Sequence, residues 1–282
     1  MSTDAGRLVT KHYDRGVAAS AMLDAIMEEL TATGHDLGEL TWQALERLDQ
    51  FHVGGGRTTL AMARRAGIGR GERVLDVGGG VGGPARTLAA TLGCHVTVLD
   101  LSEAYTEVGR SLTRRMRLSD LVEFRVGNAL DIPLSDESVD VAWTQHSTMN
   151  IEDKERLYAE LHRVVRPGGR LAMHEIVAVE GAEPLHFPVP WAASPEISFV
   201  RTAAATRATI VAAGFVERAW EDTTVSSIAW MREMAERAAA SNRSSQVQRV
   251  LLGPGFAEAF RTIRRNLEEE LASVVEGVFR RP

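Results

Sequence analysis

The chain lacks the features that mark several large classes of protein. Of its 282 residues only Cys94 is a cysteine, which excludes a disulfide framework and a cysteine-based metal site. Such a sequence suits a reducing compartment, and we expect the cytoplasm. Residues 1–20 contain no apolar signal core, and no apolar run approaches the roughly 18 residues that a membrane span needs. We therefore expect neither export nor membrane insertion.

An excess of basic charge is also lacking. The 32 Lys and Arg residues are outnumbered by 38 Asp and Glu residues, which gives a formal net charge of −6. Because nucleic-acid binding relies on a basic surface that neutralises phosphates, we expect no nucleic-acid partner. Hydrophobic residues make up 44% of the chain and charged residues 25%, values that are typical of a globular protein with a sizeable core.

Short apolar segments alternate with amphipathic ones from residue 72 onward. Strands connected by crossover helices form a parallel sheet that is covered on both faces. We expect strands at residues 73–77, 95–99, 122–126, 139–143, 170–177, 216–223 and 273–279. We expect helices within residues 17–48 and at residues 84–92, 103–118, 153–165, 202–213, 227–240 and 256–271.

A glycine-rich turn follows the first expected strand. Its sequence, VLDVGGGVGGPA, places Gly78 and Gly80 between a strand and a helix. Glycines at this point let the backbone approach a ligand, and the helix N-terminus supplies amide donors. Asp100 ends the second strand about twenty residues further on, where an acid accepts hydrogen bonds from both ribose hydroxyls of a nucleoside. The pair predicts a cofactor that contains adenosine.

Asp76 distinguishes between two cofactors of this kind. The pyrophosphate of a dinucleotide is best approached by an uncharged turn, whereas Asp76 lies two residues before the first glycine. An acid at this position suits a ligand with an ammonium group. The sequence therefore favours S-adenosylmethionine over NAD(P).

Four segments resemble the class I S-adenosylmethionine-dependent methyltransferases in their order and spacing. The resemblance covers about residues 50–225, and it is strongest to the small-molecule branch that includes sarcosine/dimethylglycine and quinone-ring methyltransferases. The segments are DVGGGVGG (76–83), LDLS (99–102), GNALDIPLSDESVDVAW (127–143) and RVVRPGGRL (163–171). The resemblance implies an α/β fold: a doubly wound, mostly parallel, seven-stranded Rossmann-like sheet with an antiparallel last strand.

The expected division of the chain follows from these patterns. Residues 1–70 would form an N-terminal helical cap and cofactor lid, and residues 71–282 the methyltransferase domain. Four prolines between residues 184 and 195 predict an irregular lid loop at residues 181–200. A helical insertion at about residues 226–270 precedes the last strand. Two roles stay open for it: capping the pocket, or joining copies of the chain into a homo-oligomer.

The resemblance also implies roles for residues around S-adenosylmethionine, whose product is S-adenosylhomocysteine. Gly78 and Gly80 would pack beneath the methionine and ribose part, and Leu101 would lie against adenine. Asn128, helped by the backbone of Ala129, would reach the adenine amino group. The family more often has aspartate where this chain has Asn128, but an amide oxygen can still accept this hydrogen bond.

Three more residues complete the expected cofactor site. Gln145, just after the fourth strand, would meet the methionine end of the cofactor. Tyr13 would close over the cofactor. His52, in the loop FHVGGG, would border the site, as similar segments do in the sarcosine-type relatives.

Methyl transfer from a sulfonium needs no metal, and we expect none. It gains speed from alignment, desolvation and removal of the acceptor's proton. His146 follows the fourth strand and is the candidate general base. His174 and Glu175 lie on the fifth strand, where alternation directs one of them into the site; Glu175 would alternatively bind a substrate ammonium. Phe187 and Trp191 in the lid loop are the candidate contacts to substrate.

These observations predict an enzyme that transfers a methyl group from S-adenosylmethionine to oxygen, nitrogen or activated carbon of a small molecule. Two alternatives stay open: an NAD(P)-dependent reductase and a non-catalytic protein that binds S-adenosylmethionine. An amine acceptor such as sarcosine needs charged partners, whereas a phenol or an activated carbon needs a base and an apolar pocket. His146 and the aromatic lid favour the second kind of acceptor, and the nearest named relatives favour the first.

Overall fold

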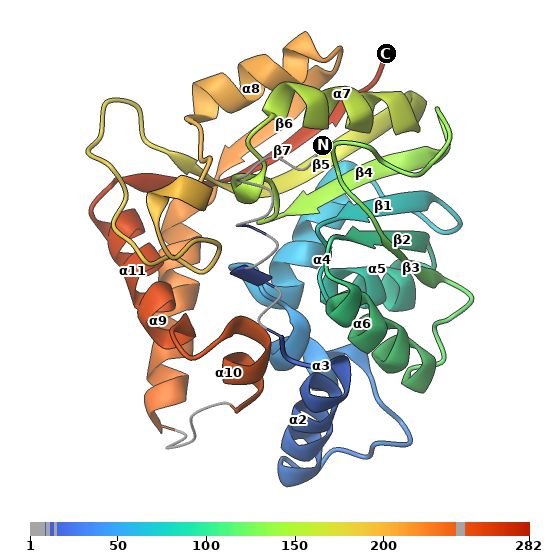
Figure 1. Ribbon diagram of the computed structural model, residues 1–282. Coiled ribbons are helices and arrows are strands. Elements are labelled where there is room, and N and C mark those ends of the chain that lie inside the picture. The colour runs from blue at the N-terminus through green and yellow to red at the C-terminus, as the bar shows by residue number, and fades with distance from the viewer. Residues whose placement is uncertain (1–8, 10–11, 14–15, 241–245) are drawn as a thin grey trace.

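A single sheet of seven strands organises the molecule. The computed structural model describes residues 9, 12–13, 16–240 and 246–282. The strand order is β3-β2-β1-β4-β5-β7-β6, and every neighbouring pair is parallel except the two that include β7 (Figure 1). The predicted fold class is thereby confirmed. The strands are β1 (Arg73–Val77), β2 (His95–Asp100), β3 (Val122–Val126), β4 (Val139–Gln145), β5 (Val165–Ala178), β6 (Val216–Asp222) and β7 (Ala272–Arg280).

Helices connect these strands and extend beyond the sheet. Two of them, α4 and α10, were not predicted from the sequence, and β5 begins five residues before its expected start at residue 170. The helices are α2 (Ala19–Ala32), α3 (Trp42–Asp49), α4 (Gly55–Ala66), α5 (Gly83–Leu92), α6 (Glu103–Arg115), α7 (Lys154–Val164), α8 (Ala203–Ala212), α9 (Thr224–Ala240), α10 (Gln246–Leu252) and α11 (Phe256–Glu268). Two short 3-10 turns, η1 (Thr148–Asn150) and η2 (Pro195–Ile197), lie after β4 and in the lid loop.

The two faces of the sheet carry separate hydrophobic cores because side chains alternate along each strand. Val74 and Val141 face a core with α4 and α5, while their neighbours Leu75 and Ala142 face a core with α7 and α8. Burial on both faces explains why the central strands have almost continuous apolar sequences. The same burial fixes the sheet edge at which the strands end.

Helix α4 packs against one face of the sheet. Its start, Gly55 and Gly56, has low helix propensity, which concealed the helix in the sequence. Met62 and Ala63 are nevertheless fully buried in the core on the α5 face. The division of the chain at residue 70 stays a prediction. Helix α4 precedes residue 70 in the sequence, but it packs against elements that follow residue 70.

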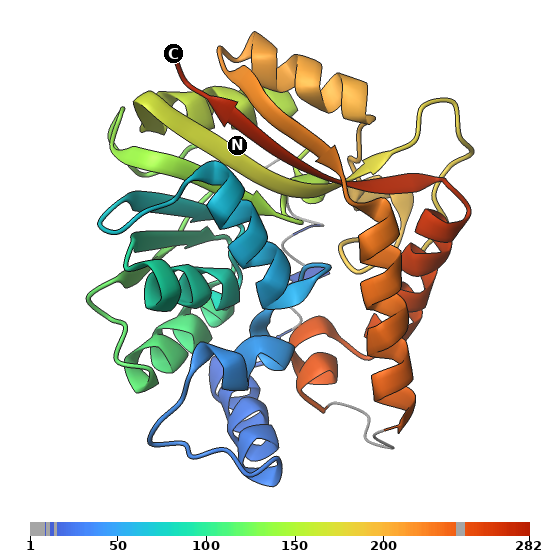
Figure 2. The same cartoon turned by 180° about the vertical axis from the view of Figure 1, so that it is seen from behind.

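The insertion between β6 and β7 contains α9, α10 and α11. Seen from behind in Figure 2, α9 and α11 stand beside the sheet, and α10 reaches across toward α2. Leu251 of α10 packs with Ile26 of α2 and Tyr105 of α6, and the Tyr105 hydroxyl donates to the Leu251 carbonyl at 2.6 Å. The insertion therefore spans the ligand-facing end of the sheet rather than extending one of its faces.

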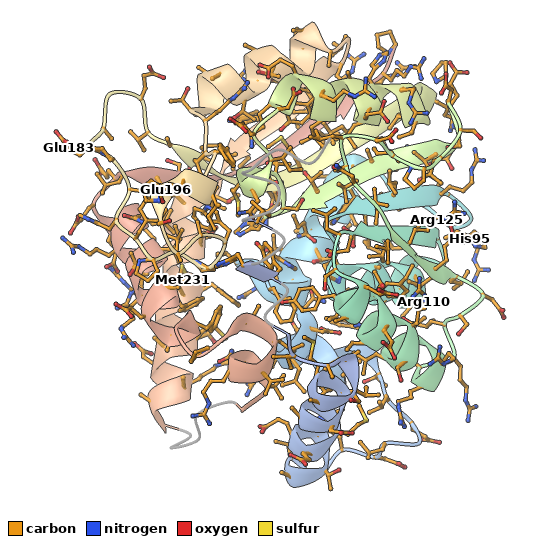
Figure 3. All side chains as sticks on the ribbon, viewed as in Figure 1. His95, Arg110, Arg125, Glu183, Glu196 and Met231 are labelled. Atoms are coloured by element: carbon orange, nitrogen blue, oxygen red, sulfur yellow. The ribbon has the colours of Figure 1, made fainter. Side chains whose placement is uncertain are left out.

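Charged side chains cover the outside of the molecule (Figure 3). Arg110 and Arg125 lie at the β3 edge, and Glu183 and Glu196 lie at the opposite side. Within the described residues, no helix combines the length and the apolar character that crossing a bilayer requires.

Candidate active site

A large cavity of about 2540 Å³ opens at the carboxyl ends of the parallel strands. Strand β1 pairs with β2 on one side and β4 on the other, so the loops that follow β1 and β4 diverge at this point. Ligands of open α/β sheets bind in such a crevice. Two parts of the cavity wall differ in character. The turn side consists of residues 76–80, 99–102 and 126–130. The apolar side consists of Met149, Ile176, Trp191, Phe199, Trp230, Phe260 and Ile263.

On the turn side, Gly78 follows β1 and lies close to the segment that follows β4. Its φ of +71° lies in the left-handed region, and its N–H donates to the Leu99 carbonyl at 2.7 Å. A Cβ at Gly78 would come within 2.4 Å of the Ser147 Cβ. At Gly80, by contrast, a Cβ would meet nothing closer than 3.9 Å, so the space above this glycine is open to a ligand.

Asp100 is oriented by two backbone amides at the end of β2. Gly80 N–H donates to Oδ2 at 2.9 Å, and Ser102 N–H donates to Oδ1 at 2.8 Å. Burial raises the pKa of Asp100, and these amide hydrogen bonds oppose that rise. Each carboxyl oxygen keeps a lone pair for a further donor, which suits two adjacent hydroxyl groups.

Asp76 is a buried carboxyl without a complete set of partners. It is 1% exposed, and its Oδ2 has no hydrogen-bond partner among the described residues. Burial, and then the nearby charge of Asp100, raise the pKa of Asp76 to about 7. A buried carboxyl in a cavity wall calls for a positively charged partner, so the residue fits a ligand with an ammonium group.

Gln145 complements Asp76 with a donor. Its Oε1 accepts from the Trp143 indole N–H at 3.0 Å and from the Thr59 hydroxyl at 3.3 Å, so the amide orientation is determined. The Gln145 Nε2 is buried and has no hydrogen-bond partner in the described part of the chain. A carboxyl acceptor at Asp76 and an amide donor at Gln145 together match the ammonium and carboxylate of an amino acid.

Leu101 and Asn128 border the other end of the turn side. Leu101 is 47% exposed although its side chain is large and apolar. The Asn128 side-chain oxygen accepts from the Leu130 N–H at 2.9 Å, and a second lone pair of this oxygen is available. Leu101, Asn128 and Ala129 all line the cavity.

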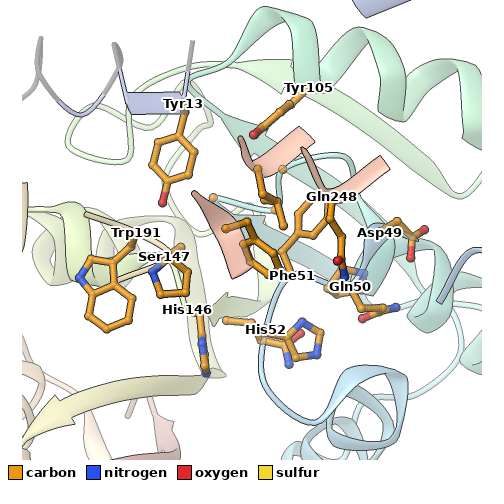
Figure 4. A pocket seen from close by; sticks show the side chains of 18 of the residues that line it. Tyr13, Asp49, Gln50, Phe51, His52, Tyr105, His146, Ser147, Trp191 and Gln248 are labelled. Carbon is orange, nitrogen blue, oxygen red and sulfur yellow. The ribbon is translucent and has the colours of Figure 1, made fainter. Parts of the chain in front are cut away.

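Three histidines meet beside the end of β4. The ring centroids of His146 and His174 are 4.6 Å apart, and that of His52 lies 6.4 Å from His146 and 6.1 Å from His174. His146 has a φ of +49°, an uncommon value for a residue with a side chain, and its N–H donates to the His174 carbonyl at 2.9 Å. Figure 4 shows His146 and His52 at the cavity together with Trp191.

Burial makes all three imidazoles neutral at neutral pH. It lowers the pKa of His52 to about 4 and, with the nearby His52, the pKa of His146 to about 3. The pKa of His174 is also well below its usual value, first through burial and then through the other two rings. His146 Nε2 is buried and has no hydrogen-bond partner among the described residues, and His146 lines the cavity.

The cavity wall brings together most of the residues predicted from the sequence. It includes His146, Trp191 and every residue expected around the cofactor: Tyr13, His52, Asp76, Gly78, Gly80, Asp100, Leu101, Asn128, Ala129 and Gln145. These residues come from the N-terminal segment, the α3–α4 loop, four strand ends and the lid loop. Their proximity is geometrical support for one binding site.

His174, Glu175 and Phe187 do not belong to this wall. His174 is 1% exposed and lies against the His146 ring. Alternation along β5 turns Glu175 to the opposite face, where its Oε1 accepts from the Thr148 N–H at 3.4 Å. Burial raises the Glu175 pKa to about 7. Direct contact of these three residues with a ligand would require the wall to rearrange.

The sequence analysis did not single out Asn150 or Ser147, which also line the cavity. A signal was present, because both follow the carboxyl end of a parallel strand, where ligand-binding residues concentrate. The segment QHSTMNI contains several polar residues in a row, and only the fold shows which of them face the cavity.

Known proteins of related sequence include methyltransferases. Residues 75–173 match the family model described as a methyltransferase domain. A glycine/sarcosine/dimethylglycine N-methyltransferase of Actinopolyspora halophila is 39% identical over 127 residues, which are 45% of this chain and 22% of that protein. The methyltransferase GfsG of Streptomyces halstedii is 34% identical over 171 residues, 61% of this chain and 58% of that protein. The chain thus spans less than two thirds of these curated relatives.

Solved structures show the same fold. The [4+2]-cyclase SpnF has a TM-score of 0.66 and 26% identity, covering 88% of this chain and 86% of that one. A geranyl diphosphate C-methyltransferase from Streptomyces coelicolor has a TM-score of 0.66 and 20% identity, covering 80% and 77% of the two chains. Residues 75–173 thus resemble a methyltransferase domain, and the predicted resemblance to the class I methyltransferases is confirmed.

Proposed function

We propose that this protein is an enzyme that transfers the methyl group of S-adenosylmethionine to a small-molecule acceptor. The observation that carries the proposal is the pairing of Asp100, held by two amides at the end of β2, with the buried carboxyl of Asp76 in the same cavity wall. One accepts from ribose hydroxyls and the other receives the ammonium group. A nicotinamide dinucleotide offers no ammonium group to Asp76.

The turn side and Gln145 together hold the cofactor along its length. Asp76 and the Gln145 amide bind the amino-acid end, Asp100 binds the ribose, and Leu101 covers one face of the adenine. S-adenosylmethionine supplies an electrophilic methyl group on a positively charged sulfur. Alignment of that methyl with the acceptor is the main contribution the protein makes to rate.

His146 is the group proposed to receive the acceptor's proton. Its imidazole is neutral at neutral pH, and its Nε2 has no hydrogen-bond partner among the described residues. Burial lowers the pKa of His146 to about 3, which disfavours an imidazolium in the resting site. Protonation of His146 during methyl transfer adds a positive charge as the sulfonium loses one, so the net charge of the site does not change.

The apolar side favours an acceptor without a fixed charge. Met149, Trp191 and Ile263 belong to one hydrophobic cluster, with Trp230 and Phe260 packed against it. An ammonium or carboxylate placed against this cluster would lose its hydration without gaining a partner. A phenol or an activated carbon on a largely apolar molecule is therefore the proposed acceptor, in preference to an amino acid such as sarcosine.

Calorimetry and product analysis together test this function. Tight binding of S-adenosylhomocysteine and none of NADH is expected; the reverse result excludes the proposal. Incubation with methyl-labelled S-adenosylmethionine and a panel of phenols, activated carbon acids and amines, followed by mass spectrometry, then identifies the acceptor class. Label that appears only in amines would contradict the apolar acceptor.

Cyclisation is a second candidate, favoured by one observation. The [4+2]-cyclase SpnF is 26% identical to this chain over the superposed residues, whereas the geranyl diphosphate C-methyltransferase is 20% identical. An apolar cavity can align the two ends of a polyene as well as an acceptor and a methyl group. Conversion of a candidate polyene into a product of unchanged mass, without incorporation of label, would support this reading over methyl transfer.

A further inference from the structure

Three segments that are distant in the sequence meet at one side chain, Asn150. It lies in η1, directly after β4, and it lines the cavity. Its Oδ1 accepts from the Tyr13 hydroxyl at 2.8 Å. Its Nδ2 donates to two carbonyls of the lid loop, that of Trp191 at 2.7 Å and that of Ile197 at 3.0 Å.

The chemistry of these partners leaves one orientation for the amide. Both lid-loop partners are backbone carbonyls, which accept and never donate, so the amino group must face them. The amide oxygen must then face Tyr13. Asparagine is thus the side chain of this length that supplies two donors to one segment and an acceptor to another, and aspartate cannot replace it.

Buried side chains bind the backbone on both sides of Asn150. The Lys154 ammonium, 5% exposed as a residue, donates to the Ile151 carbonyl at 2.7 Å and to the Thr148 carbonyl. The Thr148 N–H in turn donates to Glu175. These contacts fix the η1 turn to β5 and α7, which gives Asn150 a rigid support.

The segments that Asn150 joins both form part of the cavity wall. Tyr13 comes from the N-terminal side, and Pro190, Trp191 and Phe199 come from the lid loop. The Phe199 N–H also donates to the Met149 carbonyl at 2.8 Å, which docks the end of the loop beside Asn150. Tyr13 and the lid loop therefore both line the cavity, and both form hydrogen bonds with the side-chain amide of Asn150.

We infer that Asn150 is a positioning residue that couples Tyr13 to the lid loop, so that the two close over the cavity as one unit. The inference rests on the proposed function in one respect: it takes the cavity as the cofactor site. Loss of the Asn150 amide donors releases the loop, and the loosened loop no longer supports the position of Tyr13. Cofactor release then becomes faster.

A matched control exists at the other end of the same loop. Asn266, which is fully buried, accepts from the His186 N–H at 2.9 Å and donates to the His186 carbonyl at 3.0 Å. It ties down the loop with the same kind of side chain, and the hydrogen bonds of that side chain go to His186. N150D and N266D therefore both weaken loop anchoring. N150D keeps an acceptor for the Tyr13 hydroxyl but loses both donors to the loop, so only N150D is expected to break the link between Tyr13 and the loop.

Hydrogen exchange and ligand release test the coupling in the full-length chain. In N150D, the amides of Val189, Ala192 and Phe199, which are hydrogen-bonded in the structure, are expected to exchange at least about tenfold faster. Stopped-flow release of S-adenosylhomocysteine is measured for Y13F, N150D, N266D and the two double variants with Y13F. The Y13F effect on exchange of these lid-loop amides should disappear in N150D, whose carboxylate still accepts from Tyr13 but donates nothing to the loop, and the Y13F effects on exchange and release should persist in N266D.

Each outcome decides the inference. A Y13F effect on lid-loop exchange that is as large in N150D as in the parent chain overturns it. If N150D does not fold, Y13F alone remains informative, because coupling is reciprocal: loss of the tyrosine hydroxyl must speed exchange in the lid loop, and unchanged exchange overturns the inference. If the parent chain binds no S-adenosylhomocysteine, the proposed function fails, while the exchange measurements on Y13F and N150D still decide the coupling.

Discussion

The turn side and the apolar side of the cavity are built in different ways. The turn side comes from neighbouring strand ends within residues 76–130, and its polar groups are fixed by backbone hydrogen bonds. The apolar side is assembled from β5, η1, the lid loop, α9 and α11, which lie far apart in the sequence. A binding site that depends on backbone geometry leaves a recognisable motif in the local sequence. A cavity wall made of packed side chains from distant segments leaves no such motif.

The largest effect is expected on the turn side at Asp100. D100A removes two charge-assisted hydrogen bonds to ribose, each worth about 1.5–3 kcal/mol, so binding of S-adenosylhomocysteine should weaken by at least about a hundredfold. Calorimetry measures the change. E123Q, at an exposed carboxylate of β3 outside the cavity, is the control. Retained affinity in D100A would remove the ribose role.

His146 lines the cavity but belongs to neither the turn side nor the apolar side. H146N keeps a residue that tolerates a positive φ but lacks the basic nitrogen, so turnover should fall by about a hundredfold while cofactor affinity is kept. Steady-state kinetics and calorimetry separate the two quantities. H95N, at the exposed start of β2, is the matched substitution. Equal turnover in H146N and the parent chain would exclude a general base here.

Asp76 predicts opposite pH dependences for binding and stability. Its pKa is about 7 in the folded chain and 3.8 in its ordinary state, so an ammonium ligand should bind about tenfold more weakly for each pH unit below about 7. The folded chain without ligand holds the Asp76 proton more tightly, so this group lowers stability as pH rises from 3.8 toward about 7. D76N should flatten both profiles, as followed by calorimetry and thermal unfolding. Identical profiles in D76N would assign the pH dependence to other groups.

The apolar side should respond most weakly and only toward the acceptor. W191L removes an aromatic wall from the cavity and should raise the acceptor KM about fivefold, with little change in binding of S-adenosylhomocysteine. F187L lies on the same loop but outside the wall, and it should leave KM unchanged. A similar rise in both variants would indicate a general loosening of the loop rather than a contact to the acceptor.

The fold was largely predictable because strands and helices leave strong periodic patterns. All seven strands lie where apolar alternation placed them, and the limits of β1 and β3 agree with the prediction. Helix α4 was missed because its glycine-rich start lowers the local helix signal, and α10 is short and depends on packing against α2 and α6. Tertiary contacts overrode weak local preference at both places.

For the site, the sequence indicates cavity-lining residues where a residue type and a strand end coincide. Asp100 ends β2 and His146 follows β4, and the topology of a parallel sheet brings such positions to one edge. Prediction was less specific for side chains whose direction depends on packing. Glu175 faces Thr148, and Phe187 stays outside the wall, although both lie in segments that border the cavity.

The sequence by itself determined the class of sheet, the glycine turn and the acid at the end of β2, because each depends on contacts between residues close in the chain or on a repeating pattern. Only the tertiary structure decided which histidine reaches the cavity, how the insertion α9–α11 walls it, and that one asparagine, Asn150, holds Tyr13 and the lid loop together. These features arise from contacts between distant segments, whose geometry is set by packing around the whole sheet.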